Sequence, residues 1–421
     1  MARVLTVLDG RAIMALLVKQ ATGQQNVSIT DGSAFVSAGE LVMSTGMENT
    51  LNSLNILMNE FIVASRSYTA KLTLMDAVNH GEFSSRFSKT SFMAKDPKNT
   101  GWSNTDQYTN FAAGFTAGQN PDAGGTPQST KSQWEQNPPI PVTLNFGGST
   151  EWQNCITLYQ KKIQSALRNE SEWLRFLDGY ITEHQNDVES QREAWNRLVL
   201  LNKIASVYDM KASMPGSVVN LTAGFNQKYS TTYTSAQLRT TYYNDFLKYF
   251  VAEFKKHSKR LTERSMDYHF SPSVVQDGVT YNSLLRHTPY ADQRVYLFQD
   301  FFIDAETQVL PEIFNPEYLD IKTQYQEINF WQGESNRPAI NFTPAVINTT
   351  TGVQEAGSNV SLEYVLGGIF DKDGLMTDFQ IEDANTTSLE ARKGYRNTWL
   401  TIRKNAITDN TENSVIFIMA D

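Results

Sequence analysis

Residues 82–150 carry the feature that most constrains what this chain can fold into. The stretch is dominated by Gly, Ser, Asn, Thr and Pro, yet aromatic side chains are scattered through it. They include Phe83, Phe87, Phe92, Trp102, Tyr108, Phe111, Phe115 and Trp134. A structureless loop of this length is uncommon inside a compact domain, and a disordered linker rarely carries so many aromatic residues. We therefore expect a long β-hairpin excursion that is buried against another chain; a partly disordered insert is the alternative.

Residues 151–209 show the longest helical pattern in the chain. A line of residues repeats at alternating spacings of three and four: Leu174, Leu177, Ile181, His184, Val188, Gln191, Trp195, Leu198, Asn202 and Ala205. The line is apolar at both ends and polar in the middle, which argues against a coiled-coil seam. We expect one long helix with a break near Asn169, which packs against other parts of the protein at several places along its length.

The N-terminal part of the chain predicts little regular structure, followed by one helix. Residues 1–45 mix short apolar runs with Gly and Ser, which predicts an extended arm with at most one short helix. From Met47 to about Asn79, apolar residues at positions such as Leu51 and Leu54 recur with helical spacing. His80-Gly81 ends this pattern.

The C-terminal half predicts a mixture of helices and strands. Met214-Pro215-Gly216 breaks the chain. Beyond it we expect a helix over 235–264, a strand over 294–298, a helix over 301–310, a surface loop over 335–360, and a strand over 364–370 that turns at 371–374 into 375–381. Alternating residues over 398–403 and the apolar run 415–419 predict paired strands that close a sheet.

Composition sets limits on the class of protein. A length of 421 residues allows two or three domains, and 40% hydrophobic residues suffice for sizeable cores. The 45 acidic and 36 basic residues give a net charge of −9, which argues against a dedicated nucleic-acid binder. An acidic surface can still lie beside DNA without holding it. We find no export signal and no apolar stretch of bilayer length, so we expect a protein that is not exported and has no membrane partner.

The lone cysteine and the five histidines give no catalytic or metal-binding pattern. Cys155 cannot form an intramolecular disulfide, and we expect it to be a small buried thiol, with a reactive thiol as the alternative. The histidines are His80, His184, His257, His269 and His287, and no pair has metal-ligand spacing. His184 lies on the core line of the long helix, where a hydrogen-bonded structural histidine is favoured over a catalytic base.

Three further motifs have structural interpretations that outweigh functional ones. Asp371-Lys372-Asp373-Gly374 resembles the start of a calcium loop but lacks the closing Glu, so a hairpin turn is favoured. Lys255, Lys256, His257, Lys259 and Arg260 could touch phosphate, but the flanking acids favour a solvated face. Glu382-Asp383 cannot be assigned a role. We therefore nominate no catalytic, cofactor-binding or metal-binding residue, expect no cofactor, and predict that the protein is not an enzyme.

The order of these segments resembles that of the major capsid proteins of tailed bacteriophages. The C-terminal third carries the clearest match. The similar segments are Arg294-Val295-Tyr296-Leu297-Phe298 leading into 301–315, Tyr364 to Phe370 with the turn into Met376, Lys393 to Trp399, Thr401-Ile402-Arg403, and the spine-like helix from Glu172 to Tyr208. The shared architecture is named for phage Hong Kong 97 and recurs in herpesvirus shells and encapsulins.

The resemblance implies an α+β fold of the Hong Kong 97 type and a set of domains. Its parts would be an N-terminal arm at 1–45, a following helix at 46–81, an extended loop at 82–150, a peripheral domain with a spine helix at 151–214, an axial domain at 215–390, and closing strands of both domains at 391–421. No Lys–Asn pair can be nominated for covalent crosslinking.

The resemblance also implies a function and a set of partners. The chain would assemble into hexamers and pentamers of an icosahedral shell around the double-stranded DNA of a phage. Its partners would be other copies of itself, a portal, a separate scaffolding or decoration protein, and DNA bound without sequence specificity. The protein would be part of the virion and would assemble in the cytoplasm of a host bacterium. The alternatives are an encapsulin-type compartment, another virion protein of the tail or receptor-binding kind, and a hydrolase.

Overall fold

The computed structural model divides the chain into two compact units. It describes residues 7–23, 28–45, 70–72, 76–77, 86–93, 140–147, 150–167, 170–276, 279–281, 284–308, 325–348 and 351–421. The first unit comprises Met1–Ser85, Gly148–Leu200 and Met376–Ile407, and the second comprises Arg86–Gly147, Leu201–Leu375 and Thr408–Asp421. Each unit is therefore assembled from three separate stretches of the chain.

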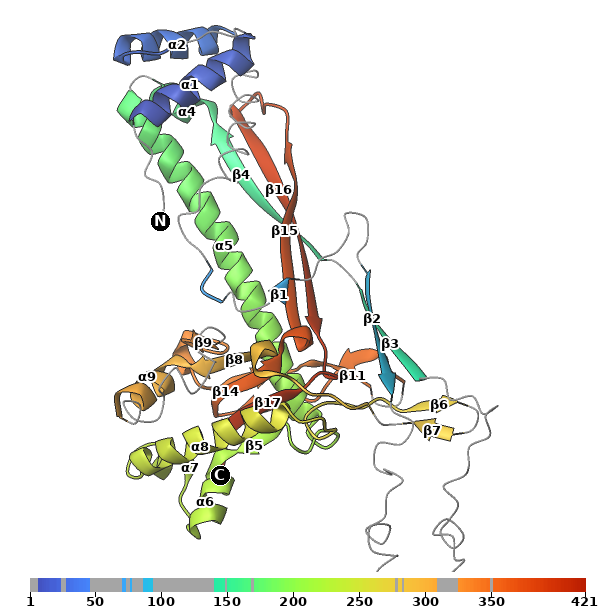
Figure 1. The fold of residues 1–421 in the computed structure, drawn as a ribbon. Coiled ribbons are helices and arrows are strands. Elements are labelled where there is room, and N and C mark those ends of the chain that lie inside the picture. The colour runs from blue at the N-terminus through green and yellow to red at the C-terminus, as the bar shows by residue number, and fades with distance from the viewer. Residues whose placement is uncertain are drawn as a thin grey trace, which may run out of the picture. The chain divides into compact units, whose positions relative to one another are not determined.

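Four helices build one end of the first unit. They are α1 (Val7–Thr22), α2 (Gly32–Ser44), α4 (Gln160–Ala166) and the first part of α5 (Glu170–Asp209). Figure 1 shows α1 and α2 beside α4 and the first turns of α5. Their shared core comprises Ile13, Met14, Leu17, Val18, Phe35, Ala38, Val42, Leu158, Ile163, Ala166, Leu167 and Trp173.

The prediction of an extended arm over 1–45 is wrong for its described residues, because they form these two helices. The apolar residues of α1, from Ile13 to Val18, recur at spacings of three and four, as do Phe35, Ala38 and Val42 in α2. That spacing gives each helix one apolar face. The two faces meet each other and α4, so the arm residues bury their own apolar surface within the chain.

A four-stranded sheet completes the first unit. Its order is β1 (Asp76–Ala77), β15 (Leu375–Thr386), β16 (Tyr395–Thr408) and β4 (Thr150–Tyr159). The predicted long helix is therefore wrong over 151–159, where β4 pairs antiparallel with β16. β-branched and aromatic residues such as Trp152, Ile156 and Tyr159 favour this extended conformation. The predicted break near Asn169 is confirmed, since α4 ends at Ala166 and α5 begins at Glu170.

Of the helix predicted from Met47 to about Asn79, only residues 70–72 and 76–77 lie within the described residues. Its end is wrong, because residues 70–72 form no helix and Asp76–Ala77 is the short strand β1, parallel to β15. The remainder of that prediction lies outside the described residues. Ala70 donates its backbone N–H to Glu189 of α5, and Asn196 of α5 donates to the carbonyl of Leu72, so this stretch follows α5.

The second unit is built on a five-stranded sheet. Its order is β5 (Val218–Asn220), β17 (Ser414–Met419), β14 (Tyr364–Asp371), β8 (Gln293–Phe298) and β9 (Tyr325–Ile328). The strands predicted over 294–298 and 364–370 are confirmed. The prediction that the last two strands pair is wrong, because β16 belongs to the first unit's sheet and β17 lies between β5 and β14 in the sheet of the second. Every residue of β17 is buried, which explains its continuous apolar sequence.

Helices cover this sheet with an aromatic core. They are α6 (Leu221–Tyr229), α7 (Ser235–Leu238), α8 (Tyr243–Leu261) and α9 (Gln299–Gln308). Phe250 of α8 packs edge-on against both Phe301 of α9 and Phe417 of β17. The single helix predicted over 235–264 is divided into α7 and α8, since Thr234 and Gln237 form a capping box that starts a separate short helix.

Small two-stranded ribbons complete the second unit. The surface loop predicted over 335–360 instead forms two ribbons, in which β10 (Ile340–Phe342) pairs with β13 (Val360–Leu362) and β11 (Ala345–Ile347) pairs with β12 (Gln354–Ala356). β6 (Val274–Gln276) pairs with β7 (Val279–Tyr281). Within the part of the chain that the structure describes, no helix is both long and apolar enough to cross a bilayer.

The packing of α2 gives a testable expectation. Replacing Phe35 by Ala, at a side chain with no exposure, should destabilise the first unit by about 3–5 kcal/mol because a large buried ring is lost. Leu41→Ala is the control in the same helix: its side chain is 39% exposed, so the change should stay within about 0.5 kcal/mol. Urea unfolding and trypsin cleavage within 1–45 would measure both. Equal behaviour of the two variants would contradict the packing described.

Candidate assembly site at the base of the β2–β3 hairpin

The 82–150 stretch begins and ends as a two-stranded ribbon. β2 (Arg86–Met93) and β3 (Ile140–Gly147) pair antiparallel along their whole lengths, from Arg86 opposite Gly147 to Met93 opposite Ile140. The pairing expected of a hairpin is therefore confirmed at its base, while residues 94–139 lie outside the described residues. Along β2, Ser91 and Met93 are buried whereas Phe92 is 58% exposed. One face of the ribbon therefore packs on the second unit and the other faces outward.

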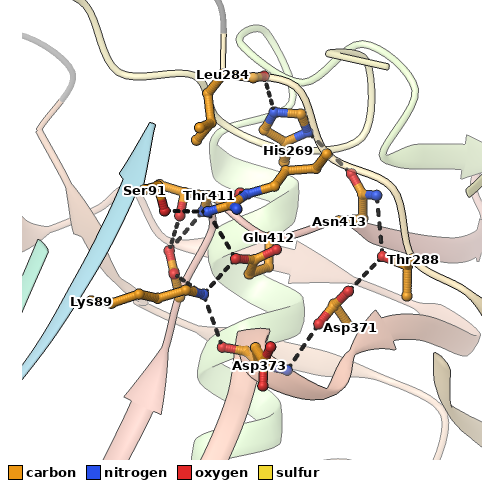
Figure 2. Close-up of polar contacts among 12 residues, drawn as sticks. Lys89, Ser91, His269, Leu284, Thr288, Asp371, Asp373, Thr411, Glu412 and Asn413 are labelled. Atoms are coloured by element: carbon orange, nitrogen blue, oxygen red, sulfur yellow. Dashed lines mark hydrogen bonds and ion pairs between the residues drawn. The ribbon is translucent and has the colours of Figure 1, made fainter. Parts of the chain in front are cut away.

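Lys89 joins β2 to the segment between β16 and β17. Its Nζ lies 2.9 Å from Oδ2 of Asp409 and 2.5 Å from Oε1 of Glu412 (Figure 2). The same nitrogen donates to the carbonyl of Asp373 at 3.4 Å. These partners raise the pKa of Lys89 against the opposing effect of its own burial, so the ammonium remains charged.

Arg286 makes a second set of contacts to the same segment. Its Nη2 lies 2.9 Å from Oε1 of Glu412 and donates to Oγ of Ser91 at 2.6 Å, while its Nε donates to the carbonyl of Thr411 at 3.2 Å (Figure 2). Glu412 is thus shared between Lys89 and Arg286. Glu412 therefore holds two side chains of β2. It pairs with Lys89 directly, and it holds Ser91 through Arg286.

The segment 409–413 is polar in sequence but buried in the structure. Each of its five residues exposes 6% or less of its surface. Its backbone is bonded on three sides, by Phe270 to the Asn410 carbonyl, by Asp371 to the Asn413 carbonyl, and from Asp409 to the Gly374 carbonyl. A Cβ at Gly374 would lie 3.1 Å from the Cβ of Glu412, a tight contact that glycine avoids.

Lys203 of α5 donates hydrogen bonds to this buried segment. Its side chain has no exposure, and Nζ donates to the carbonyl of Asp409 at 2.6 Å and to Oδ1 of Asn410 at 3.0 Å. Burial lowers the pKa of Lys203 to about 8, although the acids Asp409 and Glu412 act in the opposite direction. Asp409 is also fully buried, and Lys89 together with the Thr411 hydroxyl keeps the pKa of its carboxyl low despite that burial.

A chain of hydrogen bonds extends this polar cluster to β14. Thr288 donates to Oδ2 of Asp371 at 2.6 Å, Asn413 donates to the Thr288 hydroxyl at 3.2 Å, and Oδ1 of Asn413 lies 3.1 Å from Nδ1 of His269 (Figure 2). The other ring nitrogen of His269 lies 2.6 Å from the carbonyl of Leu284. Burial lowers the pKa of His269 and raises that of Asp371, so in each group burial disfavours the charged form.

The cluster is suited to holding a strand in place. Three basic side chains, Lys89, Lys203 and Arg286, face the acids Asp409 and Glu412 with most of their charges out of water. Removing one partner from such a buried set leaves an uncompensated charge, which is costly. In the described part of the chain no group of three or more His, Cys, Asp or Glu side chains could hold a metal ion. The ion pairs of Lys89 and Arg286 lead us to interpret the cluster as an anchor for the hairpin.

The histidines identified in the sequence are not brought together. His269 is hydrogen-bonded within the cluster, His257 packs edge-on against Tyr268 and Phe417, and His287 is exposed. His80 lies outside the described residues. His184 is buried as expected, and its Nε2 has no hydrogen-bond partner among the described residues, so a hydrogen bond at that atom stays a prediction.

Other residues singled out in the sequence also differ from expectation. Cys155 was expected to be buried in a helix but is exposed on strand β4. Residues 371–374 form a turn in which the Asp371 carboxylate accepts from the backbone of Asp373. The expected hairpin is wrong, because β14 and β15 on either side belong to different sheets.

The basic run on α8 is a surface feature. Lys256 pairs with Glu253 at 2.6 Å, and Lys259 and Arg260 are exposed, whereas His257 points into the core. Burial lowers the pKa of His257 to about 4, which keeps it neutral and separates it from the run. Asp383 is exposed and accepts from the backbone of Ala384. The side chain of Glu382 lies outside the described part.

The cluster itself escaped the sequence analysis. A polar run such as 409–413 between two strands normally forms an exposed turn, so nothing in its composition marks it as buried. Lys89 and Lys203 are single lysines without a motif. Their common partner, Asp409, lies 320 residues from Lys89 and 206 residues from Lys203 in the chain. Local sequence patterns do not encode contacts over such separations.

The chain is similar to solved capsid structures but not to any protein-family model or characterised protein sequence. A solved chain from the capsid structure of Staphylococcus phage Andhra is similar, with a TM-score of 0.50, 9% identity and 83% of each chain covered. The chain has a Hong Kong 97-type capsid fold. The α+β capsid fold expected from the sequence is therefore confirmed.

Two further solved chains are similar at lower scores. One comes from the structure of the head fiber and inner core protein gp22 of native bacteriophage P68, with a TM-score of 0.48, 8% identity, and 81% of this chain and 83% of that chain covered. The other comes from the capsid of the cyanophage P-SCSP1u, with a TM-score of 0.42, 10% identity, and 85% and 89% covered.

The shared acid of the anchor gives a sharp prediction for this capsid fold. Glu412→Gln should destabilise the second unit by about 3–5 kcal/mol, because Lys89 and Arg286 would each lose a buried charged partner. Asp292→Asn is the matched control, since Asp292 pairs with Lys372 where both side chains are about one-third exposed and exposed pairs contribute about 0–1 kcal/mol. Urea unfolding and hydrogen exchange of 86–93 are the measurements. Unchanged exchange of β2 in Glu412→Gln would contradict the anchoring role.

The buried ammonium of Lys203 predicts a pH dependence. Its pKa is about 8 in the folded chain and 10.5 as its ordinary value, so between these values the unfolded chain binds the extra proton. Stability should therefore rise with pH across this window. Relative to Lys203→Met, the wild type should gain about 2 kcal/mol in unfolding free energy between pH 8 and pH 10. Urea unfolding of both proteins at stepped pH tests this, and parallel pH profiles would refute it.

Proposed function

We propose that this chain is the major capsid protein of a tailed bacteriophage, which assembles into hexamers and pentamers of an icosahedral shell around double-stranded DNA. The observation that carries the proposal is a capsid fold in which buried ion pairs hold the β2–β3 ribbon. The proposal has no catalytic step. Copies of the same chain are the principal partners, with a portal, a separate scaffolding or decoration protein and unspecifically packaged DNA as the others.

The proposed parts follow the fold. The hairpin of β2, β3 and residues 94–139 acts as an extended loop, the first unit as a peripheral domain with α5 as its spine, and the sheet of the second unit as an axial domain. Residues 1–45 act as the arm, although their described part is helical. The protein resides in the virion and assembles in the host cytoplasm.

Multivalent contact explains why the hairpin needs an anchor. A subunit in a closed shell is held by many weak contacts, which act together only when each is presented in a set geometry. Lys89 and Ser91 fix the base of the hairpin, and the exposed ring of Phe92 lies on its outward face. The aromatic residues between 94 and 139 would then reach a neighbouring subunit from a defined starting direction.

Shortening the hairpin tests the proposal. Replacing residues 97–136 by a four-residue Gly-Asn linker should leave a folded subunit with normal urea unfolding but abolish closed shells in negative-stain electron microscopy. The reason is that the anchor stays intact while the reach to a neighbour is lost. The control replaces the exposed turn Glu334–Asn336 by Gly-Ser-Gly and should still form shells.

The outcomes separate the alternatives. Normal closed shells from the shortened chain would overturn the role of the hairpin. Wild-type protein that forms only discrete trimers would favour a tail protein, and monomers alone would contradict a shell protein. Shells that enclose protein cargo and exclude DNA during phage growth would identify a compartment of the encapsulin kind.

A further inference from the structure

Helix α8 of the second unit carries a concentration of positive charge. Between Phe246 and Leu261 it has one acidic side chain, Glu253, and five basic ones. The basic side chains are Lys248, Lys255, Lys256, Lys259 and Arg260. The chain as a whole has a net charge of −9, so this stretch is opposite in sign to the protein that surrounds it.

The packing of α8 determines where these charges lie. The core side of the helix is formed by buried residues at helical spacing, among them Phe246, Phe250, Phe254, His257 and Leu261. Lys248, Lys255 and Lys259 follow one another at spacings of seven and four on the opposite side, with the small residue Ala252 between the first two. Lys248 and Lys259 are exposed. A rise of 1.5 Å per residue spreads these three lysines over about 16 Å of the helix.

Contacts within the chain account for only part of this charge. Lys256 pairs with Glu253 at 2.6 Å. Lys259 and Arg260 lie in the last turn, where basic side chains interact favourably with the helix dipole. Lys248 lies outside that turn, and among the described residues neither Lys248 nor Lys259 forms an ion pair with an acid. The outward side of α8 therefore keeps positive charge that the fold itself does not neutralise.

Helix α6 adds another basic side chain beside α8. The two helices are neighbours (Figure 1), and Nζ of the exposed Lys228 of α6 lies 5.2 Å from the centre of the Tyr249 ring of α8. The nearest acids in the sequence on the outward side are Asp245, in the first turn, and Glu263, just beyond the last. The basic surface thus occupies the middle of α8, with an acid at each end.

A duplex phosphate backbone complements this surface in charge and in length. Double-stranded DNA carries one negative charge per about 1.7 Å of its axis, so roughly ten charges lie within the span of the three lysines. Lysine ammonium groups on long, flexible stems contact phosphates without reading the bases. An acidic protein partner would need carboxylates placed to match this row, whereas any stretch of duplex presents phosphates along it.

We propose that the outward face of α8, through Lys248, Lys255 and Lys259, binds the phosphate backbone of double-stranded DNA without sequence preference. The inference rests on the proposed function, which supplies the DNA, and it assigns the DNA contact to one surface of the second unit. The flanking acids and the overall negative charge keep each contact weak, so DNA is held near the face and can still move along it.

The salt dependence of DNA binding tests the assignment. Full-length subunits are titrated into a fluorescent duplex of about 30 base pairs, and anisotropy is measured at stepped salt. Three phosphate contacts predict that the binding constant falls about 40-fold between about 50 and 200 mM salt. Lys248→Gln with Lys259→Gln leaves one contact, so the fall should shrink to about 3.5-fold. The control, Lys161→Gln with Lys162→Gln, makes the same charge change at exposed residues of α4 and should keep the wild-type dependence.

Lysine acetylation of the wild type gives a second measurement that needs no variant. Bound duplex should slow the acetylation of Lys248 and Lys259, read by mass spectrometry, and leave Lys161 and Lys162 unchanged. Equal protection of both pairs would overturn the assignment to α8. So would the absence of binding by the wild type at about 50 mM salt, or an equal salt dependence in the wild type and the α8 variant.

Shell formation separates this inference from the proposed function. The α8 variant should still form closed shells in negative-stain electron microscopy, because the face is assigned to DNA and not to a neighbouring subunit. Loss of shells in that variant alone would identify the face as a contact between subunits and overturn the proposal. Wild-type protein that binds duplex through α8 but forms no shells would support the α8 assignment and overturn the proposed function.

Discussion

The second unit depends on a buried set of charges around Glu412. This carboxylate is shared by Lys89 of the hairpin and Arg286, while Lys203 of α5 holds the backbone of the same segment. Each of these charged groups is expensive to bury alone. Together they form a mutually compensated network that is satisfied only when all its elements are in place. Such a network specifies one position of the hairpin where apolar packing alone would accept several.

The anchor explains how a two-stranded ribbon can hold a fixed position on the second unit. A two-stranded ribbon is marginally stable by itself in water, and β2 gains its support from one face only, through Lys89 and Ser91. The opposite face, with Phe92, stays outward. Strand β2 therefore has two different faces: alternate residues hold the ribbon to the second unit, and the residues between them face outward.

Local sequence patterns predicted helices and strands correctly where the apolar residues follow one helical or strand spacing throughout the segment. The strands over 294–298 and 364–370 and most of α5 follow this rule, as does the pairing at the base of the 82–150 hairpin. Errors arose where tertiary partners decide the outcome. Residues 151–159 lie beside β16 and become a strand, and the two C-terminal strands enter different sheets because nothing in their sequences encodes which strand each will meet. The candidate site was missed for the same reason, since its acids and bases are far apart in the chain.

The chain order of the anchor has a consequence for biosynthesis. The ribbon strand β2 is made early, but its partners Asp409 and Glu412 follow more than 300 residues later, and the interior strand β17 comes after them. A growing polypeptide on the ribosome therefore carries β2 without its ionic partners and a sheet without the strand that pairs with both β5 and β14. A nascent chain therefore cannot hold β2 in its final position until translation has passed the segment 409–413.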